Sequence, residues 1–113
     1  MEVKRGEIYW VDWSPRRGSE QTGMRPALII QNNVGNKFSP TTIVASVTTS
    51  IGKVYPFQVG CSPKESGLSK DSLINLANIM TVDKVRLVKR AGNLSQDKMA
   101  EVDAAIEASL GLE

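Results

Sequence analysis

Residues 18–32, GSEQTGMRPALIIQN, begin as a polar loop containing glycine and continue as an unbroken apolar run over residues 27–30. A buried strand should therefore rise directly out of a loop that carries four polar side chains, Ser19, Glu20, Gln21 and Arg25. Polar loops anchored on buried scaffolds are common places for binding and catalysis. Taken alone, this stretch has a simpler interpretation, which is a β-hairpin loop with solvated polar side chains.

The segments around this stretch predict a fold made mostly of strands. Strands are expected at residues 6–13, 27–31, 41–48 and 72–80, and apolar residues on both faces of 6–13 predict a strand covered on both sides. Residues 54–59 should form an edge strand, because Pro56 cannot donate to a central ladder. The intervening residues 33–40 and 60–70 are expected to be turns and loop, and residues 82–87 a short helical turn.

The C-terminal part predicts one helix. Ser95 can cap it, and an apolar stripe recurs at three- and four-residue steps through Met99, Val102, Ile106 and Leu110. Many short strands and one terminal helix indicate an α+β fold, mainly β, with a small, strongly curved sheet or barrel. At 113 residues, the chain is expected to be a single domain, residues 1–113.

Composition limits the chemistry that the chain can carry out. The only cysteine is Cys61 and there is no histidine, which excludes an internal disulfide and a Cys/His metal site and removes the commonest general acid or base. We therefore expect no metal and no bound cofactor of the chain's own. No apolar stretch has the length of a membrane span and residues 1–7 lack the apolar core of a signal peptide, so a cytoplasmic protein is expected.

The basic residues are unevenly distributed. The formal net charge is +2, but residues 1–60 hold seven Lys/Arg against four Asp/Glu. Arg16, Arg17 and Arg25 flank or belong to the polar loop. Clustered arginines favour a polyanion partner, and a solvated surface explains them equally well.

A simple register argument gives Arg25 a partner. If strands 27–31 and 41–48 pair antiparallel with Asn32 opposite Thr41, Arg25 lies opposite Thr48. A guanidinium beside a hydroxyl suits a phosphodiester, and Glu20 could act as a base or orient Arg25. Each residue also has a structural explanation, an Arg–Glu ion pair holding the loop and a threonine that favours strands.

The chain resembles the MazF/PemK family of toxin endoribonucleases from type II toxin–antitoxin systems. The resemblance lies in RGEIYWVDWSP, GSEQTGMRPALIIQN and SPTTIVASVTTS, and continues through GLSKDSLINL, TVDKVRL and VDAAIEASLGL. It implies an SH3-like barrel of the plasmid-toxin type with a C-terminal helix, acting as a homodimer. It also implies sequence-specific, metal-independent cleavage of single-stranded RNA or mRNA to 2′,3′-cyclic phosphate and 5′-hydroxyl ends. A cognate antitoxin would neutralise the toxin by occupying its RNA groove.

Matching the family motif residue by residue implies that Arg25 and Thr48 are the catalytic pair and that Glu20 lies with them. RNA-binding roles are expected for Ser19, Gln21, Arg16, Arg17 and Lys53. The chain departs from the family at residues 77–81, ANIMT, where relatives commonly show Glu-Gln-Ile-Arg-Thr. A salt bridge that the family could form there is therefore not expected.

Two other functions remain to be compared with the nuclease. One is a gyrase-binding toxin of the same fold, like the CcdB family, and the other is a non-catalytic SH3-like RNA-binding module. The polar cluster GSEQTGMRP together with Thr48 favours the nuclease, because a protein that only binds does not need it.

Overall fold

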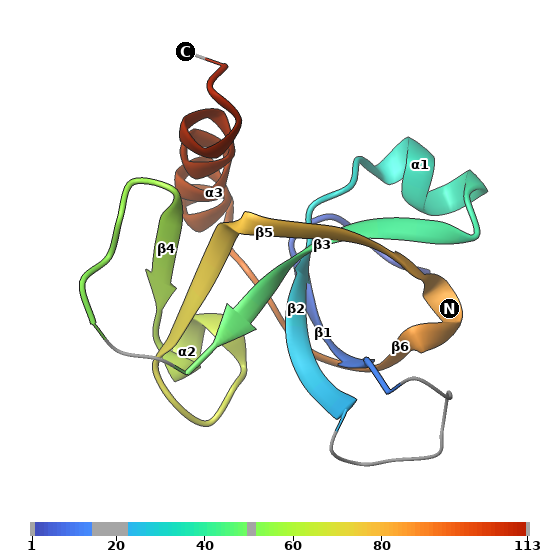
Figure 1. The fold of residues 1–113 in the computed structure, drawn as a ribbon. Helices are drawn as coiled ribbons and strands as arrows, with labels where there is room; N and C mark the ends of the chain where they lie inside the picture. The colour runs from blue at the N-terminus through green and yellow to red at the C-terminus, as the bar shows by residue number, and fades with distance from the viewer. Residues whose placement is uncertain (1, 15–22, 50–51, 113) are drawn as a thin grey trace.

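The computed structural model describes residues 2–14, 23–49 and 52–112. Within them the chain forms six strands, three α-helices and one 3₁₀ helix (Figure 1). The strands are β1 (Glu7–Asp12), β2 (Met24–Ile29), β3 (Thr41–Thr48), β4 (Gln58–Cys61), β5 (Ser72–Asp83) and β6 (Leu87–Asn93). The helices are α1 (Asn33–Phe38), α2 (Pro63–Ser66) and α3 (Gln96–Leu110), and the 3₁₀ helix is Lys84–Arg86.

The six strands form one antiparallel sheet in the order β4-β5-β3-β2-β1-β6. The sheet is strongly curved, with β5 sweeping across β3 and β6 folding back along β1 (Figure 1). The pairing of β3 with β5 shifts register between Ala45 and Ser46, and irregularities of this kind bend a strand. The predicted α+β fold with a small curved sheet and a C-terminal helix is confirmed.

Both faces of the sheet are buried. One core cluster includes Ile8, Leu28 and Ala45. The other includes Tyr9, which follows Ile8 in β1, and its cross-strand partner Ala27. Successive side chains of a strand point to opposite faces, so the central strands supply both clusters at once. This confirms that the first predicted strand is covered on both sides.

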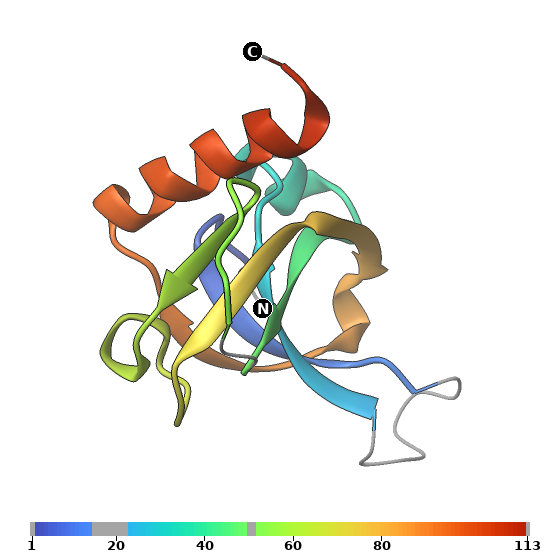
Figure 2. The same ribbon diagram turned by 60° about the vertical axis from the view of Figure 1, so that its left-hand side comes forward.

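Helix α3 covers one face at the edge formed by β4 and β5 (Figures 1 and 2). The Ser95 hydroxyl accepts a hydrogen bond from the Lys98 backbone at 3.2 Å, as the predicted cap requires. Val102 is fully buried in the first core cluster, and Met99 and Ile106 pack against it. Leu110, the last residue of the predicted stripe, is 59% exposed and does not belong to this contact.

Two connections predicted as turns contain helices. Residues 33–40 include α1, which begins after Asn32, whose side chain accepts a hydrogen bond from the Gly35 backbone at 2.7 Å. The loop 60–70 includes α2, capped by Ser62. In α1, the Asn32 cap helps to offset the low helix propensity of Asn and Gly.

Two strands begin at residues other than those predicted. The edge strand β4 begins at Gln58 rather than residue 54, because Pro56 lies in a turn closed by a 2.9 Å hydrogen bond from the Gln58 amide to the Tyr55 carbonyl. Strand β2 begins at Met24, so Arg25 belongs to the sheet and not to the loop before it. Residues 87–93, which carried no strand signal, form β6. Among the described helices, none is long and apolar enough to cross a bilayer.

Candidate active site

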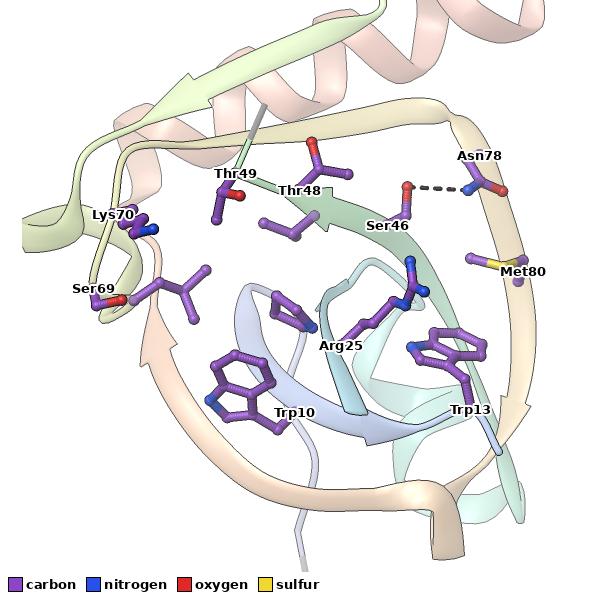
Figure 3. A pocket seen from close by; sticks show the side chains of 13 residues that line it. Trp10, Trp13, Arg25, Ser46, Thr48, Thr49, Ser69, Lys70, Asn78 and Met80 are labelled. Atoms are coloured by element: carbon purple, nitrogen blue, oxygen red, sulfur yellow. Dashed lines mark hydrogen bonds between the residues drawn. The ribbon is translucent and has the colours of Figure 1, made fainter. Parts of the chain in front are cut away.

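A pocket of about 550 Å³ opens beside the ends of β2 and β3 (Figure 3). Its walls come from β1, β2, β3, β5 and the segment just before β5, so distant parts of the chain meet there. The described residues that line it are Trp10, Trp13, Arg25, Pro26, Ser46, Val47, Thr48, Thr49, Leu68, Ser69, Lys70, Asn78 and Met80.

Arg25 and Thr48 come together on the walls of this pocket. The structure pairs Ala27 with Ser46 and Ile29 with Val44, which is the register expected for β2 and β3. Continued toward the strand ends, this register places Arg25 opposite Thr48, and both side chains are exposed at the pocket. Arg25 is therefore held by a central strand, with Val11 of β1 as its partner on the other side.

Two tryptophans form apolar walls. Trp10 lies opposite Pro26 in the ladder of β1 and β2, and the Trp13 amide donates a 2.8 Å hydrogen bond to the Gly23 carbonyl. Figure 3 shows the rings on two sides of Arg25. Flat aromatic surfaces in a pocket of this kind suit stacking by nucleobases. Neither tryptophan is among the site residues expected from the sequence.

Ser46 and Asn78 add a polar pair at one end of the pocket. The Asn78 side-chain amide donates a hydrogen bond of 3.1 Å to the Ser46 hydroxyl (Figure 3). Ser46 could have been found from the sequence, because it shares a strand face with Thr48 two residues on. Asn78 lies in the segment where the chain departs from the family pattern, and that segment lines the site.

The charged side chains in the described lining of the pocket are all positive. Arg25 and Lys70 are its two cationic side chains, and no carboxylate is among the described residues that line the pocket. No group of three or more His, Cys, Asp or Glu side chains that could hold a metal ion exists in residues 2–14, 23–49 and 52–112. The arrangement offers guanidinium, ammonium and hydroxyl donors, which suit phosphate oxygens.

Five of the expected site residues lie outside the part of the chain that the structure describes: Arg16, Arg17, Ser19, Glu20 and Gln21. Lys53 is described and does not line the pocket; its ammonium lies 5.3 Å from the centroid of the Tyr55 ring. The structure thus brings Arg25 and Thr48 together and leaves Lys53 apart from them. Lys70 and Ser69, which sequence reasoning missed, take a place in the lining.

A family model described as PemK-like, MazF-like toxin of type II toxin-antitoxin system matches residues 4–110. The chain belongs to this family. Endoribonuclease MazF of Staphylococcus epidermidis is 50% identical over 111 residues, which are 97% of this chain and 92% of the relative. The site described above therefore lies in a MazF-like toxin.

Solved structures of the family share the fold. An endoribonuclease from Mycobacterial species in complex with its cognate antitoxin is 25% identical with a TM-score of 0.80, covering 98% of this chain and 97% of that one. MazF (Form-I) from Deinococcus radiodurans is 25% identical with a TM-score of 0.75, covering 98% of both chains. Family and identity together assign the chain to the endoribonuclease toxins, and neither alternative function is supported.

Proposed function

We propose that this MazF-like toxin cleaves single-stranded RNA, including mRNA, at a short specific sequence and thereby stops translation and growth. The observation that carries the proposal is that Arg25 and Thr48 line one pocket, at the ends of two central strands whose register directs them opposite each other, and that the described lining holds cations and no carboxylate. An anionic substrate is attracted to such a pocket, and a preorganised guanidinium stabilises charge that develops there.

In the proposed reaction the RNA supplies its own nucleophile. The 2′-hydroxyl attacks the neighbouring phosphorus, the new O2′–P bond forms, and the bond from phosphorus to the 5′-oxygen breaks. The products are a 2′,3′-cyclic phosphate and a 5′-hydroxyl, so the step needs neither a metal ion nor an enzyme nucleophile. One group must accept the proton of the 2′-hydroxyl and another must donate a proton to the departing 5′-oxygen.

Arg25 and Thr48 would serve the phosphate in this step. The guanidinium presents a planar set of donors to the phosphorane oxygens, and the hydroxyl of Thr48 adds a further donor beside it. Unperturbed arginine is a poor base, so charge stabilisation is the role we propose for Arg25. Glu20 is proposed as the base or as the group that orients Arg25.

Sequence preference would come from the rest of the pocket. Trp10 and Trp13 offer stacking surfaces, and the Ser46–Asn78 pair offers polar atoms to a base edge. The RNA-binding set that we propose in the loop is Ser19, Gln21, Arg16 and Arg17. Lys53, which lies away from the pocket, is proposed to contact RNA beyond it.

The proposed partners follow the same family assignment. A Mycobacterial relative has been solved with its cognate antitoxin, and we propose that a cognate antitoxin neutralises this chain by occupying its RNA groove. We further propose that residues 1–113 act as one domain, that two copies form a homodimer, and that the protein acts in the cytoplasm.

The direct test is to incubate the purified protein with total RNA in the presence of EDTA and to map the new 5′ ends. Cleavage within one short sequence, leaving 5′-hydroxyl ends, is expected. Arg25→Ala and Thr48→Ala should each lower the rate by about 100- to 1,000-fold, the usual effect of losing a donor to a developing charge. Unchanged circular dichroism would show that both variants fold. Intact RNA, or cleavage that requires a metal ion, would contradict the mechanism.

A further inference from the structure

The segment that links α2 to β5, residues 66–72, is held in its first half by close contacts with the backbone of β6. Gly67 has a φ of +80°, and a Cβ placed on it would lie 2.0 Å from the Ala91 carbonyl oxygen. A Cβ on Gly92 would lie 2.1 Å from the Ser66 carbonyl oxygen. Two backbones therefore touch where α2 meets β6, and only glycine permits that approach.

The second half of this segment is anchored on both sides of an exposed tip. Leu68 is buried in the core, and its amide donates a 3.0 Å hydrogen bond to the Ser66 hydroxyl. The buried Ser72 donates from its hydroxyl to the Lys70 carbonyl at 3.0 Å. Ser69 and Lys70 are exposed between these anchors. A loop tip fixed in this way can present a side chain without a large entropic penalty on binding.

Lys70 lines the pocket that contains Arg25. Figure 3 shows Ser69 and Lys70 at one end, Asn78 and Met80 at the other, and Arg25 between them. The acidic neighbour of Lys70 in sequence, Asp71, lines a different hollow.

The setting of Lys70 differs from that of Lys98 in α3. The Lys98 ammonium lies 3.4 Å from a Glu65 carboxylate oxygen and 3.5 Å from one of Glu101. In the part of the chain that the structure describes, no ion pair involves Lys70. A lysine whose charge served the fold would be expected in such a pair, whereas Lys70 is exposed and lines the pocket.

We propose that Lys70, assisted by Ser69, binds an RNA phosphate adjacent to the one held by Arg25 and Thr48. The inference rests on the proposed function, because it concerns the same substrate. The ammonium is a compact point charge that suits a phosphate without reading a base. Lys70 thus sets the path of the RNA backbone across the pocket, while Arg25 and Thr48 act on the bond that breaks.

The first experiment measures binding of an RNA oligonucleotide made uncleavable by a 2′-deoxy residue at the scissile position. Lys70→Gln should bind about tenfold more weakly at low salt, as expected for one lost charged contact. The slope of log affinity against log salt should fall by about 0.7, the single-strand value for one phosphate. Lys64→Gln is the matched control, because Lys64 is an exposed lysine of α2 that does not line the pocket. Lys70→Arg should restore most of the affinity.

The second experiment replaces the phosphates of this RNA, one at a time, by neutral methylphosphonates. At one linkage other than the scissile one, the replacement should weaken RNA binding by wild type. The same replacement should not weaken RNA binding by Lys70→Gln any further. The inference would be overturned if Lys70→Gln and wild type bound the RNA equally well. It would also be overturned if Lys70→Gln bound more weakly but every neutral linkage changed the affinity of the two proteins by the same factor. A loss tied to the scissile phosphate itself would overturn it as well. If wild type binds this RNA but does not cleave its unmodified form, only the proposed cleavage fails; if it does not bind, both fail.

Discussion

The guanidinium of Arg86 donates a hydrogen bond of 2.7 Å to the main-chain carbonyl of Ser14. The same nitrogen lies 3.2 Å from the carbonyl of Asp12, so Arg86 binds the carbonyls of the two residues that flank Trp13. The Asp12 carboxylate in turn accepts a 3.0 Å hydrogen bond from the Ser14 amide. Arg86 belongs to the 3₁₀ helix between β5 and β6, far away in sequence. It fixes the backbone of a tryptophan that lines the candidate active site.

We expect Arg86→Ala to act through Trp13. Loss of the hydrogen bonds should lower the free energy of unfolding by about 1–3 kcal/mol, measured in urea. The KM for a short RNA should rise severalfold more than kcat falls, because a stacking wall is released while Arg25 keeps its strand. Arg86→Lys should recover part of both losses. Lys89→Ala, at an exposed position of β6, is the control and should change neither.

A Trp10→Phe background allows this effect to be observed directly, since Trp13 is then the only tryptophan. Its emission should shift in Arg86→Ala without RNA present. An unchanged Trp13 spectrum together with an unchanged KM would show that Arg86 does not position this wall.

The central part of the site follows from the sequence once one pairing is assumed. With Asn32 placed opposite Thr41, the apolar run after Arg25 and the strand ending at Thr48 give one antiparallel register, and β2 and β3 adopt it. Strand register is strongly specified where side chains are buried, since a slip of one residue would move every side chain to the wrong face. Arg25 and Thr48 were predicted to meet for this reason.

The remainder of the site depends on contacts that sequence patterns do not encode. The register shift between β3 and β5 brings Asn78 to Ser46, and the close approaches of Gly67 to Ala91 and of Gly92 to Ser66 hold the chain just before Lys70. Neither contact corresponds to a periodic pattern in the sequence.

Helix α1 was missed for a similar reason. Asn36 looks like a turn residue, yet it is 2% exposed and accepts a 2.7 Å hydrogen bond from the buried Thr42 hydroxyl. A tertiary partner of this kind overrides the local preference of Asn and Gly.

The close approach of Gly92 to Ser66 predicts a large effect of a single methyl group. Gly92→Ala must separate β6 from the end of α2 and should lower the free energy of unfolding by about 1–3 kcal/mol or more, the usual range for overpacking. Gly60→Ala is the matched control, because nothing lies within 4 Å of a Cβ at Gly60. It should be neutral or slightly stabilising. Thermal and urea unfolding of the two variants tests the contrast, and equal stabilities would contradict the predicted contact.

The buried thiol of Cys61 predicts a loss of stability at alkaline pH. Burial, assisted by the nearby Glu65 carboxylate, raises the pKa of Cys61 from 9.0 to about 11. The folded state thus binds the thiol proton more tightly than the unfolded state does. This contribution is fully present below about pH 9 and is lost as pH rises to about 11, and a shift of two units corresponds to at most ~3 kcal/mol.

Urea unfolding across this pH range, compared between wild type and Cys61→Ala, measures the contribution. Wild type should lose stability more steeply with rising pH than the variant, although the variant is less stable at neutral pH because it lacks the buried sulfur. Burial also raises the pKa of Tyr9, so Tyr9→Phe is needed to separate a second alkaline contribution. Alkylation of Cys61 by iodoacetamide should likewise be slow at pH 8 and accelerate only well above it. Parallel pH profiles for wild type and Cys61→Ala would contradict a protonated, buried thiol.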